Sequence, residues 1–336
     1  MSAGSRVVRT AGKYGLYQVA RRLTSGQPRI LMYHRFTEEP AGGEASRKSF
    51  RKQVAYIRRY YHPMTLETLC GYLESGESLP RNAVVITVDD GYRDFYDIAW
   101  PVLREYSVPA TLFATTGFVS GDLWLWPDKI TWLLDNAGKN NSAFQWQSLV
   151  VKENELKTDA HRIWKSLIDF LLSVPDEEKY HVIAALAGTW GLELPEKAPK
   201  PFAACSWDQL RELQAAGIEI GGHTVTHPTL GQVSDEQAQR EINECRSRIE
   251  LELGRKPCSF CYPNGMPGDF SAGLMKRVKD SGFRCAVAAF SDSAGMKHRF
   301  ALRRHSGGDS WFQFSKAISG VELIGHYLRG QEKVYP

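Results

Sequence analysis

The chain has 336 residues, 43% of them hydrophobic and 24% charged, and its formal net charge at pH 7 is only +4. These values are typical of a globular protein built as one large α/β barrel or as two ordinary domains. So small a net charge argues against a nucleic-acid-binding surface. The sequence contains no apolar run long enough to span a membrane and no apolar signal-peptide core after Met1, so we expect a cytoplasmic protein.

Basic residues concentrate near the N-terminus, where residues 1–37 contain seven lysines and arginines and neither aspartate nor glutamate. Apolar residues recur at helical spacing over residues 5–23. This segment is either an amphipathic helix on anionic lipid, peripheral at the inner membrane face, or a solvated helix packed on the rest of the protein. We therefore distinguish a basic N-terminal helix, residues 1–28, from a main domain, residues 29–336.

From residue 29 onward, apolar runs alternate with helical patterns. The order of the first elements is a strand at 29–34, a helix at 66–74, a strand at 83–88, a helix at 92–106 and a strand at 109–115. Pro101 should kink or restart the second helix. This alternation is typical of a parallel sheet with helical crossovers. His34, at the end of the first strand, is either a site residue or a structural histidine.

Residues 121–200 interrupt this alternation. They contain six of the nine tryptophans and two predicted helices, 159–173 and 176–189. The segment is too long for an ordinary loop and too apolar to be disordered. We predict an inserted helical subdomain, whose aromatic side chains either form its own core or cover an active site.

The alternation resumes after the insertion. Ser206 and Gln209 form a capping box, and Ser234 with Gln237 caps a second helix. The remaining predicted elements are strands at 218–223, 259–262, 285–290 and 300–304, and a helix at 272–281.

Ionisable residues stand at the ends of two predicted strands. Asp89 and Asp90 follow a buried apolar run, and by themselves they fit a turn as well as a site. His223 ends another strand and His227 follows four residues later, and on a helical turn both imidazoles would share one face. One aspartate and two histidines leave coordination positions open on a divalent cation, and the second aspartate is then free to act as a general base.

Six cysteines are scattered along the chain, and Cys258 with Cys261 forms its one C-x-x-C pair. The sequence contains no second pair that would complete a zinc site. We therefore expect the cysteines to be small buried side chains in a reducing compartment.

Four segments resemble those of the polysaccharide deacetylases, the NodB-homology enzymes of carbohydrate esterase family 4. Thr87-Val-Asp-Asp-Gly-Tyr92 is similar to the first motif of the family, His223-Thr-Val-Thr-His-Pro228 to the second, and Phe260-Cys-Tyr-Pro-Asn-Gly265 to a variant of the third. The segment Ile30-Leu-Met-Tyr-His-Arg35 is similar to the start of many bacterial members. The resemblance extends over residues 29–305.

The resemblance implies an α/β fold, namely a distorted (β/α)7-type barrel, here with the inserted subdomain. It implies Asp90, His223 and His227 as ligands of a divalent metal, with Zn²⁺ the expected ion. Asp89 would be the base that takes a proton from the attacking water. The implied substrate is an N-acetylated glycan.

The third motif implies that the oxyanion and substrate are held near Tyr262 and Asn264. This motif often carries an arginine that holds the catalytic base, but Cys261 stands at that position here. Arg93, just after the first motif, is the residue we expect to replace it.

The last motif of the family is often Leu-x-His, in which the histidine protonates the leaving amine. Here Leu302 is followed two residues later by Arg304, and His305 comes one residue further on. His305 is the expected catalytic acid, although neighbouring residues of a strand point to opposite faces unless the strand is bulged.

We therefore predict a metal-dependent hydrolase that removes the N-acetyl group from a sugar of a polysaccharide, a glycan precursor or a lipid-linked oligosaccharide. Two alternatives remain open: a deformylase or amidase acting on a non-sugar amide, and a catalytically weak carbohydrate-binding protein that retains the fold. The intact aspartates and histidines favour an enzyme, whereas the two motif departures favour a binding protein.

Overall fold

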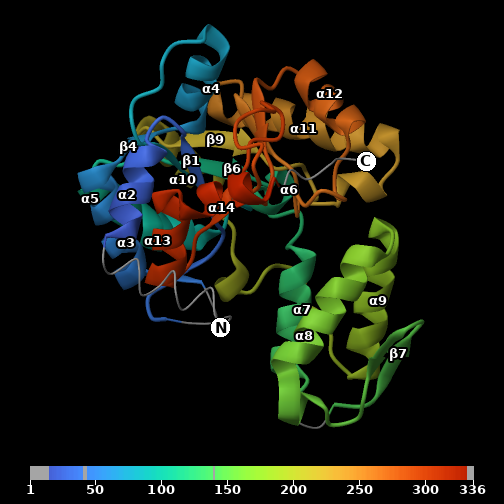
Figure 1. Cartoon of the computed structure of the whole chain (residues 1–336). Helices are drawn as coiled ribbons and strands as arrows, with labels where there is room; N and C mark the ends of the chain where they lie inside the picture. Colours follow the sequence, from blue (N-terminus) through green and yellow to red (C-terminus); the bar gives the residue numbers. More distant parts are fainter. Residues whose placement is uncertain (1–14, 41–43, 139–140, 331–336) are drawn as a thin grey trace.

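The computed structural model describes residues 15–40, 44–138 and 141–330. Most of the predicted N-terminal helix, residues 5–14, lies outside these ranges, and its described part is α2 (Leu16–Leu23). Helix α2 packs against α13 (Trp311–Ser319) and α14 (Val321–Arg329), so the first and last described helices lie on the same side of the molecule (Figure 1).

One sheet of parallel strands forms the centre of the molecule. Its spatial order is β11 (Cys285–Val287), β10 (Ser259–Cys261), β9 (Glu219–Gly222), β6 (Thr111–Ala114), β5 (Ala83–Val88), β1 (Arg29–Tyr33) and β12 (His305–Ser306), and β4 (His62–Met64) also pairs with β5. Every pairing in this sheet is parallel. The predicted α/β fold with a distorted (β/α)7-type barrel is thereby confirmed.

A single segment, residues 302–306, connects the two edges of the sheet, and we call it the closing segment. Leu302 forms a parallel bridge with Val287 of β11, whereas β12, at the other end of the segment, pairs with β1. The predicted strand at 300–304 is therefore displaced toward the C-terminus. Because the two contacts fall on opposite edges, the sheet curves into a barrel.

Helices surround the sheet. They are α3 (Arg47–Tyr60), α4 (Leu66–Ser75), α5 (Trp100–Glu105), α6 (Thr116–Val119), α10 (Trp207–Ala215), α11 (Asp235–Leu253) and α12 (Ala272–Asp280), and a small pair of strands, β2 (Phe36–Thr37) and β3 (Ala45–Ser46), lies beside them. The predicted capping box of Ser206 is formed, and Ser234 caps α11. A π-helical turn, Phe95–Ala99, precedes α5, which restarts with Pro101 in its first turn. Within the described ranges, no helix has the length and apolar character that crossing a bilayer requires.

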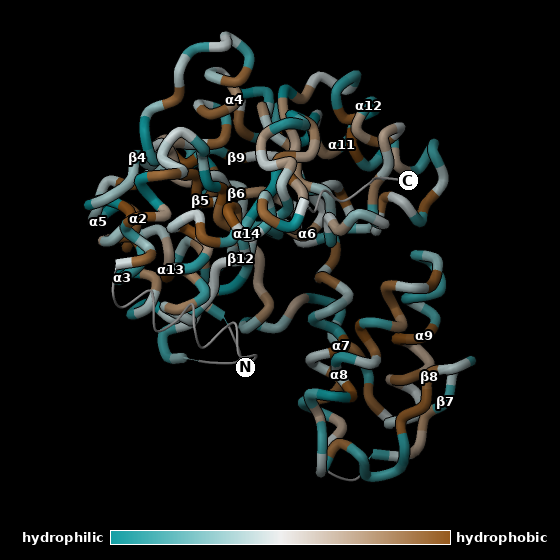
Figure 2. The backbone as a smooth tube through the Cα atoms, viewed as in Figure 1, coloured by the Kyte–Doolittle hydropathy of each residue, from teal (hydrophilic) through white to brown (hydrophobic). Residues whose placement is uncertain are grey.

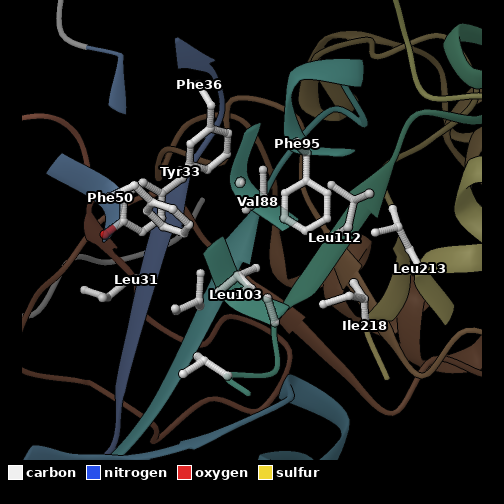
Figure 3. Close-up of a cluster of buried hydrophobic side chains, with 14 of the residues drawn as sticks. Leu31, Tyr33, Phe36, Phe50, Val88, Phe95, Leu103, Leu112, Leu213 and Ile218 are labelled. Carbon is white, nitrogen blue, oxygen red and sulfur yellow. The ribbon is translucent and has the colours of Figure 1, made fainter. Parts of the chain in front are cut away.

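The largest buried cluster fills the space between the sheet and these helices. Leu31, Val88 and Leu112 come from three adjacent strands, and Phe50 and Leu213 come from helices that cover them (Figure 3). All five side chains are fully or almost fully buried. Burial of each such side chain contributes about 1.5–3 kcal/mol relative to exposure, and this packing holds the strand ends in place.

The insertion forms a separate lobe, which we call the inserted lobe, residues 126–189. It comprises α7 (Trp126–Asn136), an antiparallel hairpin of β7 (Phe144–Trp146) and β8 (Leu149–Val151), α8 (Leu156–Ser173) and α9 (Asp176–Thr189). Its helices bury a core of their own, which includes Ile130, Leu167 and Ile183. Figure 2 shows apolar residues on the facing sides of α7, α8 and α9. Most of the aromatic side chains therefore serve this core.

Candidate active site

A cavity of about 390 Å³ lies at the carboxyl ends of the strands, where functional residues of such barrels gather. The barrel contributes His34, Arg35, Glu44, Asp89, Asp90, Tyr92, Phe202, His223, His227, Tyr262 and Asn264. Residues in or next to the inserted lobe contribute Leu125, Pro127, Asp128, Thr131 and Trp164. The cavity is therefore walled by both parts of the molecule.

Asp90, His223 and His227 form a compact cluster in this cavity. Asp90 Oδ1 lies 3.3 Å from His223 Nε2 and 3.4 Å from His227 Nε2. The three donor atoms all lie within 4.8 Å of one another, and all three side chains are buried. Burial by itself would raise the pKa of Asp90, but the hydrogen bonds from both imidazoles lower that pKa well below its usual value. The structure thus brings together the three residues that the sequence predicted as metal ligands.

The orientation of the two imidazoles suits a divalent cation. His223 Nδ1 donates to the carbonyl oxygen of Cys261 at 2.8 Å, which leaves Nε2 directed toward Asp90. A backbone carbonyl is a common support for a metal-binding histidine. His227 Nδ1 is buried and has no hydrogen-bond partner among the described residues. Two imidazole nitrogens and one carboxylate are donors that Zn²⁺ accepts while keeping a position open, so these residues fit the expected ion.

The loop from His223 to His227 is not the helical turn that the spacing suggested. Thr224 and His227 adopt left-handed backbone conformations, with φ of 67° and 62°. Glu241 of α11 accepts hydrogen bonds from two backbone N–H groups of the loop, at 2.7 and 3.0 Å. Thr224 Oγ1 accepts a further one from the His227 N–H at 3.0 Å. Left-handed residues persist only where surrounding contacts hold them, and here they turn both rings toward Asp90.

Asp89, the expected base, is held by Arg304 of the closing segment. The two buried side chains form a bidentate pair, with Nη1 2.6 Å from Oδ1 and Nη2 2.8 Å from Oδ2. Arg304 Nε also donates to the Ala288 carbonyl at 2.9 Å, which fixes its direction. Burial tends to raise the pKa of Asp89, but the positive charge of Arg304 outweighs it and lowers that pKa. Asp89 is therefore an ionised carboxylate beside the cluster of Asp90 and the imidazoles.

The pair of Asp89 and Arg304 explains both departures from the family motifs. The third motif lacks its arginine at Cys261, and the arginine of the last motif, Arg304, takes over its contact with the base. Cys261 Sγ lies 3.5 Å from Asp89 and 3.2 Å from Arg304. The position that carries the arginine in the third motif therefore still contacts the base, but the arginine itself comes from the last motif. Arg93, the replacement expected from the sequence, instead pairs with Asp97 at 3.2 Å, is exposed and does not line the cavity. The signal available in the sequence was that one motif lacks an arginine while another has gained one.

His305, the expected acid, is not brought to the cavity. Its Nδ1 lies 2.8 Å from Glu322 of α14, because Arg304 points inward and the next residue of an extended segment points outward. His34 lines the cavity instead. Its side chain is 48% exposed, and its Nε2 lies 3.6 Å from Asp89 Oδ2.

Tyr262 and Asn264 both line the cavity, as the sequence predicted for the third motif. The Tyr262 hydroxyl donates to the Phe300 carbonyl at 2.9 Å, and its ring stacks on Phe270 at a centroid distance of 4.1 Å. Asn264 Nδ2 donates to Thr229 Oγ1 at 2.8 Å. These contacts fix the backbone of the turn that follows β10.

A second charged group, which sequence reasoning missed, lies toward the inserted lobe. Arg35 Nε donates to Asp94 at 2.6 Å, and Arg35 Nη1 lies 3.8 Å from Asp128. The guanidinium also lies 4.0 Å above the ring of Tyr92, whose hydroxyl donates to Asp128 at 2.7 Å. Burial raises the pKa of Asp128 to about 7. This group supplies hydrogen-bonding atoms to one wall of the cavity.

Comparison with known protein families and sequences identifies relatives. Residues 76–147 and 162–286, more than half of the chain, match the family model described as polysaccharide deacetylase. A poly-beta-1,6-N-acetyl-D-glucosamine N-deacetylase of Escherichia coli (strain K12) is 36% identical over 63 residues, which cover 18% of this chain but only 9% of that protein. An enzyme of the same name from Staphylococcus aureus (strain MSSA476) is 24% identical over 199 residues, covering 51% of this chain and 68% of that protein.

Solved structures share the fold. The Streptococcus pyogenes deacetylase PplD, in complex with acetate, superposes with a TM-score of 0.56 and 16% identity, covering 91% of this chain and 99% of that one. IcaB from Ammonifex degensii superposes with a TM-score of 0.55 and 18% identity, covering 88% and 97%.

Proposed function

Because this chain belongs to the polysaccharide deacetylase family, we propose that it is a metal-dependent hydrolase that removes the N-acetyl group from a sugar. The observation that carries this proposal is the cluster of Asp90, His223 and His227 beside the ionised Asp89 in one cavity. The substrate is an N-acetylated glycan: a polysaccharide, a glycan precursor or a lipid-linked oligosaccharide. The names of the E. coli and S. aureus relatives support a glycan that contains N-acetylglucosamine.

Each residue of the cavity then has a distinct role. Asp90, His223 and His227 would hold the cation, which when bound polarises the acetamide carbonyl and makes water easier to ionise. Asp89 takes the proton of the attacking water, because its carboxylate is ionised and buried within reach of the cluster. Arg304 acts through Asp89, since its two hydrogen bonds fix the orientation of the base.

We assign protonation of the leaving amine to His34. It lines the cavity and lies close to Asp89, so the imidazole and the carboxylate approach the same reacting group. His305, in contrast, bonds to Glu322 and is not among the residues that line the cavity. The turn that contains Tyr262 and Asn264 is the proposed site of oxyanion and substrate contacts.

The test is release of acetate from a panel of N-acetylated oligosaccharides, with and without a metal chelator. We expect release that stops with chelator and returns when a divalent cation is added. Equal release from non-sugar acetamides would favour the amidase alternative. Glycan binding without any release would favour a carbohydrate-binding protein.

We also propose that α2 touches anionic membrane, which would place the enzyme at the inner membrane face. Arg21 and Arg22 lie on this helix, its Leu23 is 76% exposed, and Leu328 of the neighbouring α14 is 83% exposed. Basic and apolar side chains together are typical of helices that lie in the lipid interface.

Flotation with liposomes tests this contact. Leu23→Glu should reduce binding to anionic liposomes, and higher salt should reduce it further because the surface attraction is screened. Leu251→Glu is the matched control, because Leu251 is 74% exposed but lies on α11. Equal loss in both variants, or none in either, would contradict the proposal.

A further inference from the structure

Three cysteines gather at the end of the barrel opposite the cavity. Cys70 lies on α4, Cys258 directly precedes β10, and Cys285 begins β11. Cys258 and Cys285 therefore lie at the amino ends of their strands. The proposed catalytic aspartates and histidines follow the carboxyl ends, so the two groups lie at opposite ends of the barrel. All three side chains are buried. The expectation of small buried cysteines holds for each one, but the sequence did not indicate that they meet.

The three sulfur atoms are close enough to share one ion. They all lie within 4.8 Å of one another. Two thiolates that bind the same ion at about 2.3 Å each are at most about 4.6 Å apart. Only a small inward shift of the side chains would therefore complete the coordination.

Two arginines lie beside this cluster. Arg284 directly precedes Cys285, and both Arg284 and Arg299 act electrostatically on Cys70. Both guanidinium groups are held by Glu74 of α4, Arg284 Nε at 3.0 Å and Arg299 Nη1 at 3.1 Å. A cluster of thiols beside fixed positive charge differs from cysteines that only fill space in an apolar core.

We propose that Cys70, Cys258 and Cys285 bind one thiophilic monovalent cation, Cu(I). Soft thiolates select Cu(I) or zinc, and structural zinc almost always takes four protein ligands. Within the described ranges, this group of ligand atoms contains three cysteines and no fourth histidine, cysteine or carboxylate. A three-sulfur set therefore suits Cu(I) better than structural zinc. Binding replaces the thiol protons, so protons are released as the ion enters.

One of the three cysteines reaches a surface pocket. Cys258 lines a small surface pocket of about 20 Å³ together with Pro257, Glu67 and Glu219. A pocket of this size holds about one water molecule. Cys258 is 7% exposed and lines this pocket, whereas Cys70 and Cys285 are fully buried and do not line it, so Cys258 would be the first contact of an entering ion.

The experiment is an anaerobic titration of the reduced full-length protein with Cu(I), against a competing Cu(I) chelator. The protein is first loaded with zinc so that the active-site residues are occupied. We expect close to one Cu(I) per chain in the wild type, with a higher melting temperature, and loss of that binding in Cys285→Ala. Cys245→Ala is the matched control, because Cys245 is equally buried but lies outside the cluster, and it should bind like the wild type.

X-ray absorption spectroscopy of the Cu(I)-loaded wild type does not depend on any variant folding. We expect three sulfur neighbours and no nitrogen around the ion. Nitrogen neighbours would point to the active-site histidines and overturn the proposal. It is equally overturned if the wild type binds no Cu(I) in competition, or if Cys285→Ala folds and binds as much as Cys245→Ala.

Discussion

Asp89 and Asp90 are adjacent in sequence but contact different groups. Asp90 has a left-handed backbone, with φ of 78°, and its carboxylate faces the imidazoles of His223 and His227. Asp89 faces the guanidinium of Arg304. Because neighbouring side chains diverge in this way, one aspartate is available as a ligand and the other as a base.

Metal content should separate the two aspartates, although both variants should be poor enzymes. In Asp89→Asn the amide cannot accept a proton at neutral pH, so we expect a rate loss on the order of 10²–10⁴ with the metal retained. Asp90→Asn replaces an anionic ligand with a neutral amide and should lose metal. Elemental analysis and acetate release of both purified variants provide the measurement. If Asp89→Asn loses the metal and Asp90→Asn keeps it, the two roles are exchanged.

The pH dependence of activity should reveal the role of Arg304. Asp89 must be ionised to act as a base, and the charge of Arg304 lowers its pKa despite burial. In Arg304→Met that pKa rises, so the acid limb of kcat/KM should move to higher pH. Arg304→Lys keeps a positive charge and should show a smaller displacement. An unchanged acid limb in Arg304→Met would contradict Asp89 as the titrating base.

Arg304→Met should also reduce stability. It leaves the buried carboxylate of Asp89 without its main partner, and loss of one member of a buried ion pair typically costs about 3–5 kcal/mol. Urea denaturation of the wild type and the variant near neutral pH would measure this difference, and it must be known before the pH profile is interpreted.

Among the elements, α11 supports the loop that carries two of the proposed metal ligands. Its Glu241 bonds to two N–H groups of the loop from His223 to His227 and also accepts from the Thr226 hydroxyl at 2.6 Å. The loop contains left-handed residues that would relax without these contacts. Helix α11 therefore positions both imidazoles from outside the cavity.

Removal of this support should weaken metal binding without touching a ligand. Glu241→Ala should lower metal affinity by about 10–100-fold, the usual effect of losing a group that orients metal ligands. Glu241→Gln keeps one oxygen for the backbone N–H groups and should lie closer to the wild type. Competitive metal titration provides the measurement, and equal affinities in all three proteins would show that the loop holds its shape unaided.

The sequence predicted the elements better than the contacts between them. Helices α8, α10 and α11 and the central strands follow from local periodicity and caps, and the two aspartates and two histidines follow from motifs at strand ends. The partner of Asp89 could not be predicted in this way, because Arg304 is 215 residues away and no local pattern encodes that pairing. Helices α3 and α7 and the hairpin of the inserted lobe were not predicted, and they too depend on tertiary packing.

At the scale of the whole molecule, the cavity belongs to the barrel and the inserted lobe together. Trp164 of α8 lines the cavity, and its Nε1 donates to Thr131 of α7 at 3.0 Å. Lys179 of α9 is fully buried and bonds to Asp176 at 3.0 Å and to Thr229 of the barrel at 3.3 Å. These contacts join the lobe to the segment that follows His227.

The inserted lobe should therefore affect glycan binding more than chemistry. Trp164→Ala removes an aromatic surface from the cavity wall, and we expect KM for an oligosaccharide to rise about 10-fold with kcat little changed. Trp190→Ala is the control, because Trp190, directly after α9, is partly buried against the lobe core and is not among the residues that line the cavity. A similar KM increase in both variants would indicate a general loosening of the lobe instead of a contact with the glycan.

The position of the closing segment near the C-terminus affects the order in which the site can form during translation. The chain is made from its N-terminus, so Asp90, His223 and His227 emerge well before residues 302–306. In a nascent chain these three proposed metal ligands are available early, but Asp89 still lacks Arg304, and the sheet lacks the segment that joins β1 to the β11 edge. If these residues have the proposed roles, the pairing of the base with its arginine forms late in synthesis, together with barrel closure. We therefore expect a polypeptide that ends before residue 302 to release no acetate.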